Sequence, residues 1–116
     1  MGHTVLIVDD HRAFRLLARE LLESEGYLVV GEASDAVGAV EATARFQPDI
    51  VLLDVRLPDG SGLDVAKALR GQASPPLVVL ISTADYAQAV ASCGAAGFIP
   101  KGRLSAASLR KVIDAA

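Results

Sequence analysis

Five side chains that could bind a cation and a phosphoryl group each stand just after an apolar run of strand length. They are two adjacent carboxylates, a lone carboxylate, a hydroxyl and a lysine: Asp9, Asp10, Asp54, Ser82 and Lys101. Carboxylates held close together raise one another's pKa, and Mg²⁺, which prefers oxygen ligands, relieves that repulsion. A metal, a lysine and a hydroxyl stabilise a phosphoryl group during its transfer, and a carboxylate beside them can be the nucleophile. The pattern predicts an Mg²⁺ site in which Asp54, alone after its strand, is the phosphoryl acceptor.

The ligand set favours a hard cation over a transition metal. Asp10 and Asp54 are the expected direct ligands, and Asp9 is expected to act directly or through water. Asp10 taken alone would favour a helix cap, but Asp54 and Lys101 at matching strand ends favour a site. His3 and His11 lack ligand spacing and are expected on the surface, so zinc is a poor fit.

Alternating strands and helices must bring these residues together. Strands are expected at residues 4–8, 27–31, 50–53, 77–81 and 97–100. Three helices are expected over residues 14–22, 63–69 and about 85–93, and Gly26 is expected to stop the first of them. Two more helices are expected to begin after capping residues, one after Ser34 or Asp35 and the last after Ser105. This alternation predicts one α/β domain over residues 1–116, with a parallel sheet between two helical layers. Ligands of such sheets bind at the carboxyl ends of the strands.

The spacing of apolar residues also predicts which helix faces are buried. On the first helix, the residues expected to point inward are Phe14, Leu17, Ala18, Leu21 and Leu22. On the second helix, they are Val37, Val40 and Ala44.

Composition excludes several classes of protein. The 116 residues are 52% hydrophobic, yet the longest apolar runs are only strand-sized, and a membrane-spanning helix needs about 20 apolar residues. A net charge of −3 argues against direct nucleic-acid binding. The single cysteine, Cys93, cannot form an internal disulfide or a cysteine-based metal cluster and is expected to be a small buried hydrophobic residue. Without a visible signal peptide, the expected location is cytoplasmic.

Taken together, the motifs resemble the receiver domains of response regulators in two-component systems. The resemblance covers essentially the whole chain and rests on VDDH, LLDVRLPDGSGLD, VLIS and GFIPK. It implies a flavodoxin-like (βα)5 three-layer sandwich with a five-stranded parallel sheet in the order 2-1-3-4-5. The stretches VDDHRAFR and LPDGSGLDVAKAL are most similar to receivers attached to helix-turn-helix output domains of the NarL/LuxR type.

The resemblance also implies roles for individual residues. Asp54 would accept phosphate from a phosphohistidine on a sensor histidine kinase or phosphotransfer protein. Mg²⁺ would be held by Asp9, Asp10, Asp54 and the backbone carbonyl of Arg56. The domain would be a phosphoacceptor switch that assists its own phosphorylation and dephosphorylation, and not an enzyme acting on other substrates.

Phosphoryl binding and switching would involve four more positions. Ser82, Thr83 and Lys101 would contact the phosphoryl group, and Ser82 and Phe98 would switch conformation. The changed face, formed by the helix at about 85–93, the strand 97–100 and the final helix, would control an output domain or form a homodimer. Transcription regulation would then belong to an output domain, since this acidic chain is expected to bind neither DNA nor membranes.

Three positions depart from the usual receiver pattern. Gly102 follows Lys101 where many receivers have proline, which predicts a looser loop. Thr83 replaces a smaller residue, which alters access to the phosphoryl group. Phe98 lacks the hydroxyl of the more frequent tyrosine.

Two other classes of function fit the sequence less well. An aspartyl phosphatase usually carries a second acid two residues after its nucleophile, where this chain has Arg56. A flavin carrier or another small binding module would not need three carboxylates. Gly60 and Gly62 lack Walker spacing and are expected to shape a turn, and turns or caps are expected for Asp49, Asp59 and Asp64.

Overall fold

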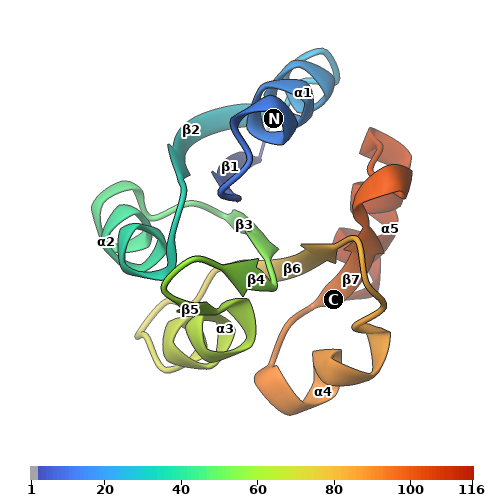
Figure 1. Cartoon of the computed structure of the whole chain (residues 1–116). Coiled ribbons are helices and arrows are strands. Elements are labelled where there is room, and N and C mark those ends of the chain that lie inside the picture. The colour runs from blue at the N-terminus through green and yellow to red at the C-terminus, as the bar shows by residue number, and fades with distance from the viewer. Residues whose placement is uncertain (1–2) are drawn as a thin grey trace.

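Five parallel strands form one sheet in the order β2-β1-β3-β6-β7 (Figure 1). The structure is a computed structural model that describes residues 3–116. The strands are β1 (Thr4–Val8), β2 (Leu28–Ala33), β3 (Ile50–Asp54), β6 (Leu77–Ser82) and β7 (Gly97–Pro100). Numbered alone, these five strands have the order 2-1-3-4-5, so the predicted topology is confirmed.

Helices cover both faces of the sheet. Figure 1 shows α1 (Arg12–Glu23) and α5 (Ala106–Ala115) on one face, and α2 (Ala36–Phe46), α3 (Gly62–Arg70) and α4 (Val90–Cys93) on the other. A small hairpin of β4 (Arg56–Leu57) and β5 (Gly60–Ser61) leads from β3 into α3. Two 3₁₀ turns, η1 (Ala87–Ala89) and η2 (Lys101–Arg103), complete the chain.

Each strand contributes to two apolar cores, one under each helical layer. Val5 and Ile7 of β1 pack in the core under α1 and α5, whereas Leu6 and Val8 pack in the core under α2, α3 and α4. Every residue of β3 is buried because this central strand is covered on both faces. The apolar runs therefore end where the strands reach the edge of the sheet, which places the polar residues that follow them at that edge.

The predicted inner face of α2 is wrong. Val37 is 62% exposed and Val40 is 38% exposed, while Ala39 and Thr43 are buried in their place. The hydroxyl of Thr43 can be buried because it donates a hydrogen bond to the backbone carbonyl of Ala39 at 2.7 Å. Apolar residues occur on several faces of this helix, so spacing alone did not identify the small-residue face that packs closest to the sheet.

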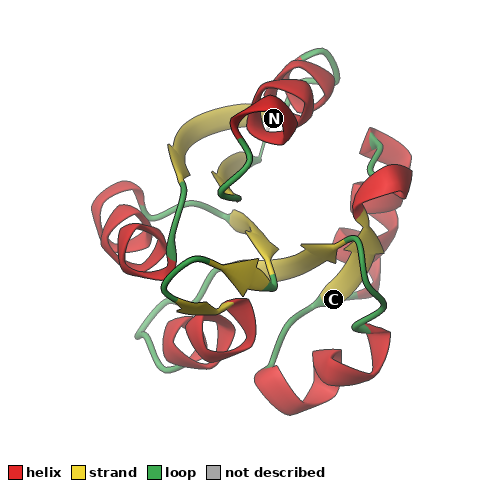
Figure 2. Ribbon diagram, in the orientation of Figure 1, coloured by secondary structure: helices red, strands yellow, loops and turns green. Residues whose placement is uncertain are grey.

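The predictions for α1 and for the fourth helix also need correction. Leu17 is 60% exposed, and α1 fully buries only Ala18 and Leu22. The helix expected at about 85–93 is a 3₁₀ turn followed by four α-helical residues (Figure 2). The carboxylate of Asp85 accepts a hydrogen bond from the backbone N–H of Ala87 at 2.9 Å, which favours a turn at the start. Within residues 3–116, no helix is long and apolar enough to cross a membrane.

The Asp49 side chain links the starts of β1 and β3. Its carboxylate accepts hydrogen bonds from the backbone N–H and the hydroxyl of Thr4, at 2.9 and 3.0 Å. The backbone hydrogen bond, above all, lowers the pKa of Asp49. A lowered folded-state pKa gives stability that is present above the unfolded-state pKa and is lost as the pH falls through the folded-state pKa.

Asp49→Asn is expected to lower the free energy of unfolding by about 0.5–1 kcal/mol at pH 7, because it removes a charge-assisted acceptor on the surface. The difference from the wild type should shrink as the pH falls below about 4. Urea unfolding at pH 7 and at low pH measures both effects. A difference that stays constant with pH would contradict the charge-based explanation.

Candidate functional site

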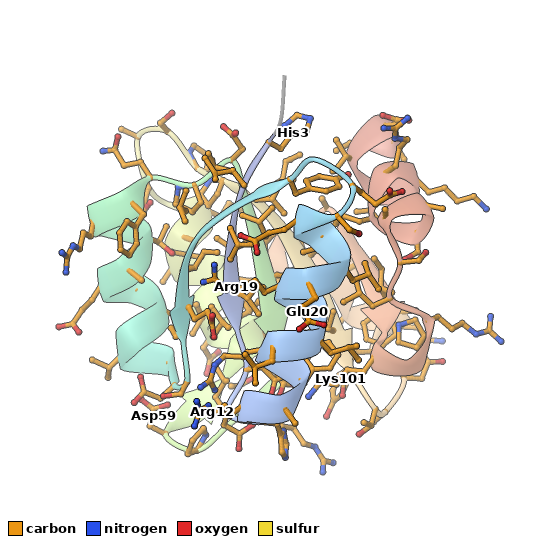
Figure 3. All side chains as sticks on the ribbon, turned by 90° about the horizontal axis from the view of Figure 1, so that it is seen from above. His3, Arg12, Arg19, Glu20, Asp59 and Lys101 are labelled. Carbon is orange, nitrogen blue, oxygen red and sulfur yellow. The ribbon has the colours of Figure 1, made fainter. Side chains whose placement is uncertain are left out.

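A lysine joins two buried carboxylates at the carboxyl edge of the sheet. Asp9 directly follows β1 and is fully buried, and Asp54 ends β3 and is 3% exposed. The Nζ atom of Lys101, the residue after β7, lies 2.6 Å from Asp9 Oδ2 and 3.1 Å from Asp54 Oδ2. Figure 3 places Lys101 beside α1, toward the end of the molecule that carries Arg12 and Asp59. Three of the predicted site residues therefore form one cluster.

The backbone at Asp9 is fixed by an arginine and a glutamate. The Asp9 N–H donates to the carbonyl of Ala33 at 3.0 Å, which extends the β1–β2 pairing beyond the predicted end of β2. Arg15 donates to the Asp9 carbonyl at 2.7 Å and to Glu32 at 3.0 Å. Burial raises the pKa of Glu32, but hydrogen bonds and charges from Arg19 and Arg15 outweigh it and lower the pKa overall.

The two buried carboxylates of the cluster repel each other. Burial raises the pKa of the Asp54 carboxyl, and the nearby charge of Asp9 raises it further, against the opposing effect of Lys101. Burial acts to lower the pKa of Lys101, but its close contacts with the carboxylates of Asp9 and Asp54 raise it overall. Lys101 therefore stays charged, and one ammonium group is shared between two carboxylates.

Gly62 lets the start of α3 pass directly beside Asp54. Its N–H donates to the carbonyl of Val55 at 2.7 Å, and a Cβ at this position would overlap the backbone carbonyl oxygen of Asp54. Gly60 is less constrained, since a Cβ there would meet only the Ala36 side chain at 3.8 Å. Of the two glycines expected to shape the turn, Gly62 is thus the one that the backbone beside Asp54 requires.

Gly62→Ala is expected to lower the free energy of unfolding by about 2–3 kcal/mol, because the backbone at Asp54 must move to make room. Gly60→Ala is the matched control and should change it by less than about 1 kcal/mol. Thermal or urea unfolding of the two variants gives the comparison. Equal free energies of unfolding for the two variants would show that the close approach at Gly62 does not affect stability.

His11 is part of the cluster, which the sequence analysis missed. Its Nδ1 atom lies 3.1 Å from Asp9 Oδ1 and 3.2 Å from Asp10 Oδ1. The chain turns back after β1, and the His11 N–H donates to Asp9 Oδ1 at 2.8 Å. One ligand atom each from Asp9, Asp10, His11 and Asp54 lie within 4.8 Å of one another. His11 is exposed, as expected, but the expectation that it lacks ligand spacing is wrong, and its position directly after the acidic pair was the available signal.

The remaining predicted residues surround this cluster. Ser82 ends β6 and is buried, and its Oγ accepts a hydrogen bond from the N–H of Ala84 at 3.1 Å. Thr83 is exposed in the following loop. Phe98 of β7 is half-buried and packs against the core under α2, α3 and α4. Arg56 is exposed, and its Nε donates to the hydroxyl of Tyr86 at 3.4 Å, a contact that the sequence did not indicate.

Several structural expectations outside the cluster are confirmed. Asp59 accepts hydrogen bonds from the N–H groups of Ala36 and Val37, at 2.6 and 3.1 Å, and so caps the start of α2 together with Asp35. Cys93 is 1% exposed. Gly102 lies in the 3₁₀ turn η2, where a Cβ would meet open space, and the looser loop expected there stays a prediction.

Comparison with protein-family models identifies the chain. Residues 5–114 match the model of the response regulator receiver domain. The chain belongs to the response regulator receiver domain family. Receiver domains are phosphoacceptor switch domains of two-component systems, which argues against the phosphatase and flavin-carrier alternatives.

Individual relatives agree with this assignment. The receiver is 39% identical over 116 residues to the probable transcriptional regulatory protein NarL of Mycobacterium tuberculosis, covering 97% of this chain and 54% of that protein. It is 35% identical over 120 residues to the virulence regulator BvgA of Bordetella pertussis, covering all of this chain and 55% of that protein. The chain spans about half the length of the curated relatives it matches.

Solved structures confirm the fold. The receiver domain of the putative response regulator NarL from M. tuberculosis has a TM-score of 0.86 at 37% identity, covering 97% of this chain and 94% of that one. The chemotaxis response regulator CheY4 of Vibrio cholerae has a TM-score of 0.83 at 25% identity, with 98% of both chains covered.

The acidic pocket of this receiver fits a divalent cation. Receiver domains bind Mg²⁺ at such a pocket. Asp9 Oδ2 is buried and, within residues 3–116, has no well-aligned hydrogen-bond partner, although the Lys101 ammonium group is close enough for an ion pair. Carboxylates from Asp9, Asp10 and Asp54 supply the oxygen donors that Mg²⁺ prefers.

Proposed function

We propose that Asp54 accepts a phosphoryl group from the phosphohistidine of a sensor histidine kinase or phosphotransfer protein in an Mg²⁺-dependent reaction. The observation that carries the proposal is the Lys101 ammonium group shared between Asp9 and Asp54 at the carboxyl edge of β1, β3 and β7. The buried Asp54 carboxylate therefore has a positively charged group beside it.

The phosphoryl transfer exchanges one bond for another. A carboxylate oxygen of Asp54 attacks phosphorus, the phosphorus–nitrogen bond breaks, and its electron pair stays on the imidazole nitrogen of the donor. Lys101 favours the ionised form of Asp54 before the attack and can then pair with a phosphoryl oxygen. The hydroxyls of Ser82 and Thr83 donate to the phosphoryl group, with Ser82 on the strand beside Asp54.

Metal binding belongs to the same cluster. Asp9, Asp10 and Asp54, with the backbone carbonyl of Arg56, would hold the Mg²⁺ ion. When bound, Mg²⁺ neutralises charge on the phosphoryl oxygens. These residues would provide a compact set of oxygen donors, and Gly62 lets the start of α3 approach the backbone of Asp54, one of those donors.

Phosphorylation is proposed to switch the surface formed by α4, β7 and α5. The Ser82 hydroxyl, which now accepts a hydrogen bond from Ala84, would turn toward the phosphoryl group and draw in the loop after β6 (Figure 2). Phe98 would then move further into the core. This is a shift between two conformations driven by the added charge of about −1.5 to −2.

The altered surface would control an output domain, a partner protein or a second copy of the chain. Among the relatives are transcription regulators about twice the length of this chain, which favours transcription regulation as the output. A cytoplasmic location stays a prediction from the sequence.

The test is phosphorylation by a small donor. Incubation with acetyl phosphate and Mg²⁺, followed by intact mass measurement and Phos-tag electrophoresis, should show one added phosphoryl group. Asp54→Ala should abolish the adduct, and Asp59→Asn, an exposed aspartate outside the cluster, should retain it. Failure of the wild type to be modified would overturn the proposal.

A further inference from the structure

We propose that His11 is a metal ligand of the carboxylate cluster, through Nδ1, and that it tunes the site toward transition-metal dications such as Zn²⁺ and Co²⁺. The inference rests on the metal site of the proposed function and adds a nitrogen donor to the oxygen set described there. It concerns which metal the cluster selects, not whether the cluster binds a cation.

The distances between donor atoms match those around a bound metal. His11 Nδ1 lies 3.1 Å from Asp9 Oδ1 and 3.2 Å from Asp10 Oδ1. Neighbouring ligands at about 2.1 Å from a metal are separated by about 3.0 Å in octahedral geometry and about 3.4 Å in tetrahedral geometry. Both distances from Nδ1 therefore fall in the range expected between neighbouring ligands of one metal ion.

The chain positions the histidine, and its Nδ1 atom lies within hydrogen-bonding distance of Asp9 Oδ1, so a bound metal ion would replace that contact. It precedes α1 in extended conformation, and its N–H is bound to Asp9 Oδ1 at 2.8 Å. Within residues 3–116 the ring makes no capping hydrogen bond to α1. The side chain is 69% exposed, so water can reach the ring while Nδ1 faces the carboxylates.

A second observation points to a ligand in the same place. Asp9 is fully buried, and its Oδ2 atom, which lies 2.6 Å from the Lys101 ammonium group, has no aligned hydrogen-bond partner among the described residues. The buried carboxylate thus presents one oxygen toward Lys101 and the other toward His11. One lysine charge is shared between the carboxylates of Asp9 and Asp54. A dication beside His11 would add positive charge to the same cluster.

The chemistry of imidazole makes the effect selective. Mg²⁺ is a hard cation that takes oxygen ligands, whereas Zn²⁺ and Co²⁺ bind imidazole well and bind mixed nitrogen and oxygen sites more tightly. Removing His11 should therefore weaken Zn²⁺ binding much more than Mg²⁺ binding. Metal selectivity, measured as a ratio of affinities, is the quantity that His11 controls.

Zn²⁺ titration of ¹⁵N-labelled protein tests the assignment. Long-range ¹H–¹⁵N spectra should show the Nδ1 resonance of His11 moving on Zn²⁺ addition, with little change at His3, which lies at the opposite end of the molecule (Figure 3). Calorimetry should show that the ratio of Zn²⁺ to Mg²⁺ affinity falls by about tenfold or more in His11→Ala. His3→Ala is the matched control and should leave the ratio unchanged.

The outcomes separate this inference from the proposed function. A ratio unchanged in His11→Ala, or a His11 Nδ1 resonance that stays in place at saturating Zn²⁺, would overturn the role of His11 while leaving Mg²⁺ binding and phosphorylation intact. Loss of Zn²⁺ binding in Asp10→Asn would support the shared site. Absence of Mg²⁺-dependent phosphorylation in the wild type would instead reject the proposed function, whatever Zn²⁺ does.

Discussion

Lys101→Met is expected to lower the free energy of unfolding of the metal-free protein by about 2–4 kcal/mol at pH 7. The substitution leaves two buried carboxylates, Asp9 and Asp54, without the cation that lies 2.6 and 3.1 Å from their oxygens. It also removes the contact of the ammonium group with the ring of Phe14, whose centroid is 4.9 Å away. Urea unfolding in the presence of a chelator measures the loss.

Two controls isolate the charge effect of Lys101. Lys111→Met replaces an exposed lysine on α5 and should change the free energy of unfolding by less than about 0.5 kcal/mol. The double variant with Asp54→Asn should recover part of the loss, since one of the two uncompensated charges is gone. A Lys101→Met variant as stable as the wild type would show that the lysine does not compensate these carboxylates.

Asp54→Asn is expected to stabilise the metal-free protein by about 1 kcal/mol at pH 7, while it abolishes phosphoryl acceptance. Burial and the charge of Asp9 raise the folded-state pKa of Asp54, so the ionised carboxylate lowers stability at any pH above that pKa. The cost disappears as the pH falls below the unfolded-state pKa of about 3.9, where both states are protonated. The advantage of the variant should therefore shrink on acidification.

Asp59→Asn is expected to change the free energy of unfolding in the opposite direction to Asp54→Asn. Asp59 caps α2, and hydrogen bonds from the backbone N–H groups of Ala36 and Val37 lower its pKa. Its replacement should therefore destabilise the protein at pH 7, where Asp54→Asn stabilises it. If both variants shift the unfolding midpoint in the same direction at pH 7, the assignment of strain to Asp54 is wrong.

The sequence was informative where burial forces a simple pattern. The central strands are covered on both faces, so each appears as an unbroken apolar run, and the first polar residue marks the edge of the sheet. This is why Asp9, Asp54, Ser82 and Lys101 could be placed at one edge without coordinates. The strand order followed from the resemblance to receivers and is confirmed, whereas the chemical roles of these residues remain predictions.

The parts that sequence analysis got wrong depend on forces that spacing does not show. On α2, valines and alanines lie on several faces, and close packing of the helix selected Ala39 and Thr43 rather than Val40. A side-chain hydrogen bond from Asp85 favours a tight turn where a longer helix was expected. His11 reaches the cluster because a loop hydrogen bond turns the chain back, a local geometry that its position after two aspartates only hints at.

Chemical mapping of the phosphorylated residue tests the central claim most directly. Protein phosphorylated by acetyl phosphate with Mg²⁺ can be reduced with borohydride, which converts an aspartyl phosphate into homoserine, and then sequenced by mass spectrometry. Homoserine at position 54 alone is the predicted result. Homoserine at Asp9, Asp10 or Asp59 in place of Asp54, or none at all in protein that carries phosphate, would contradict the account.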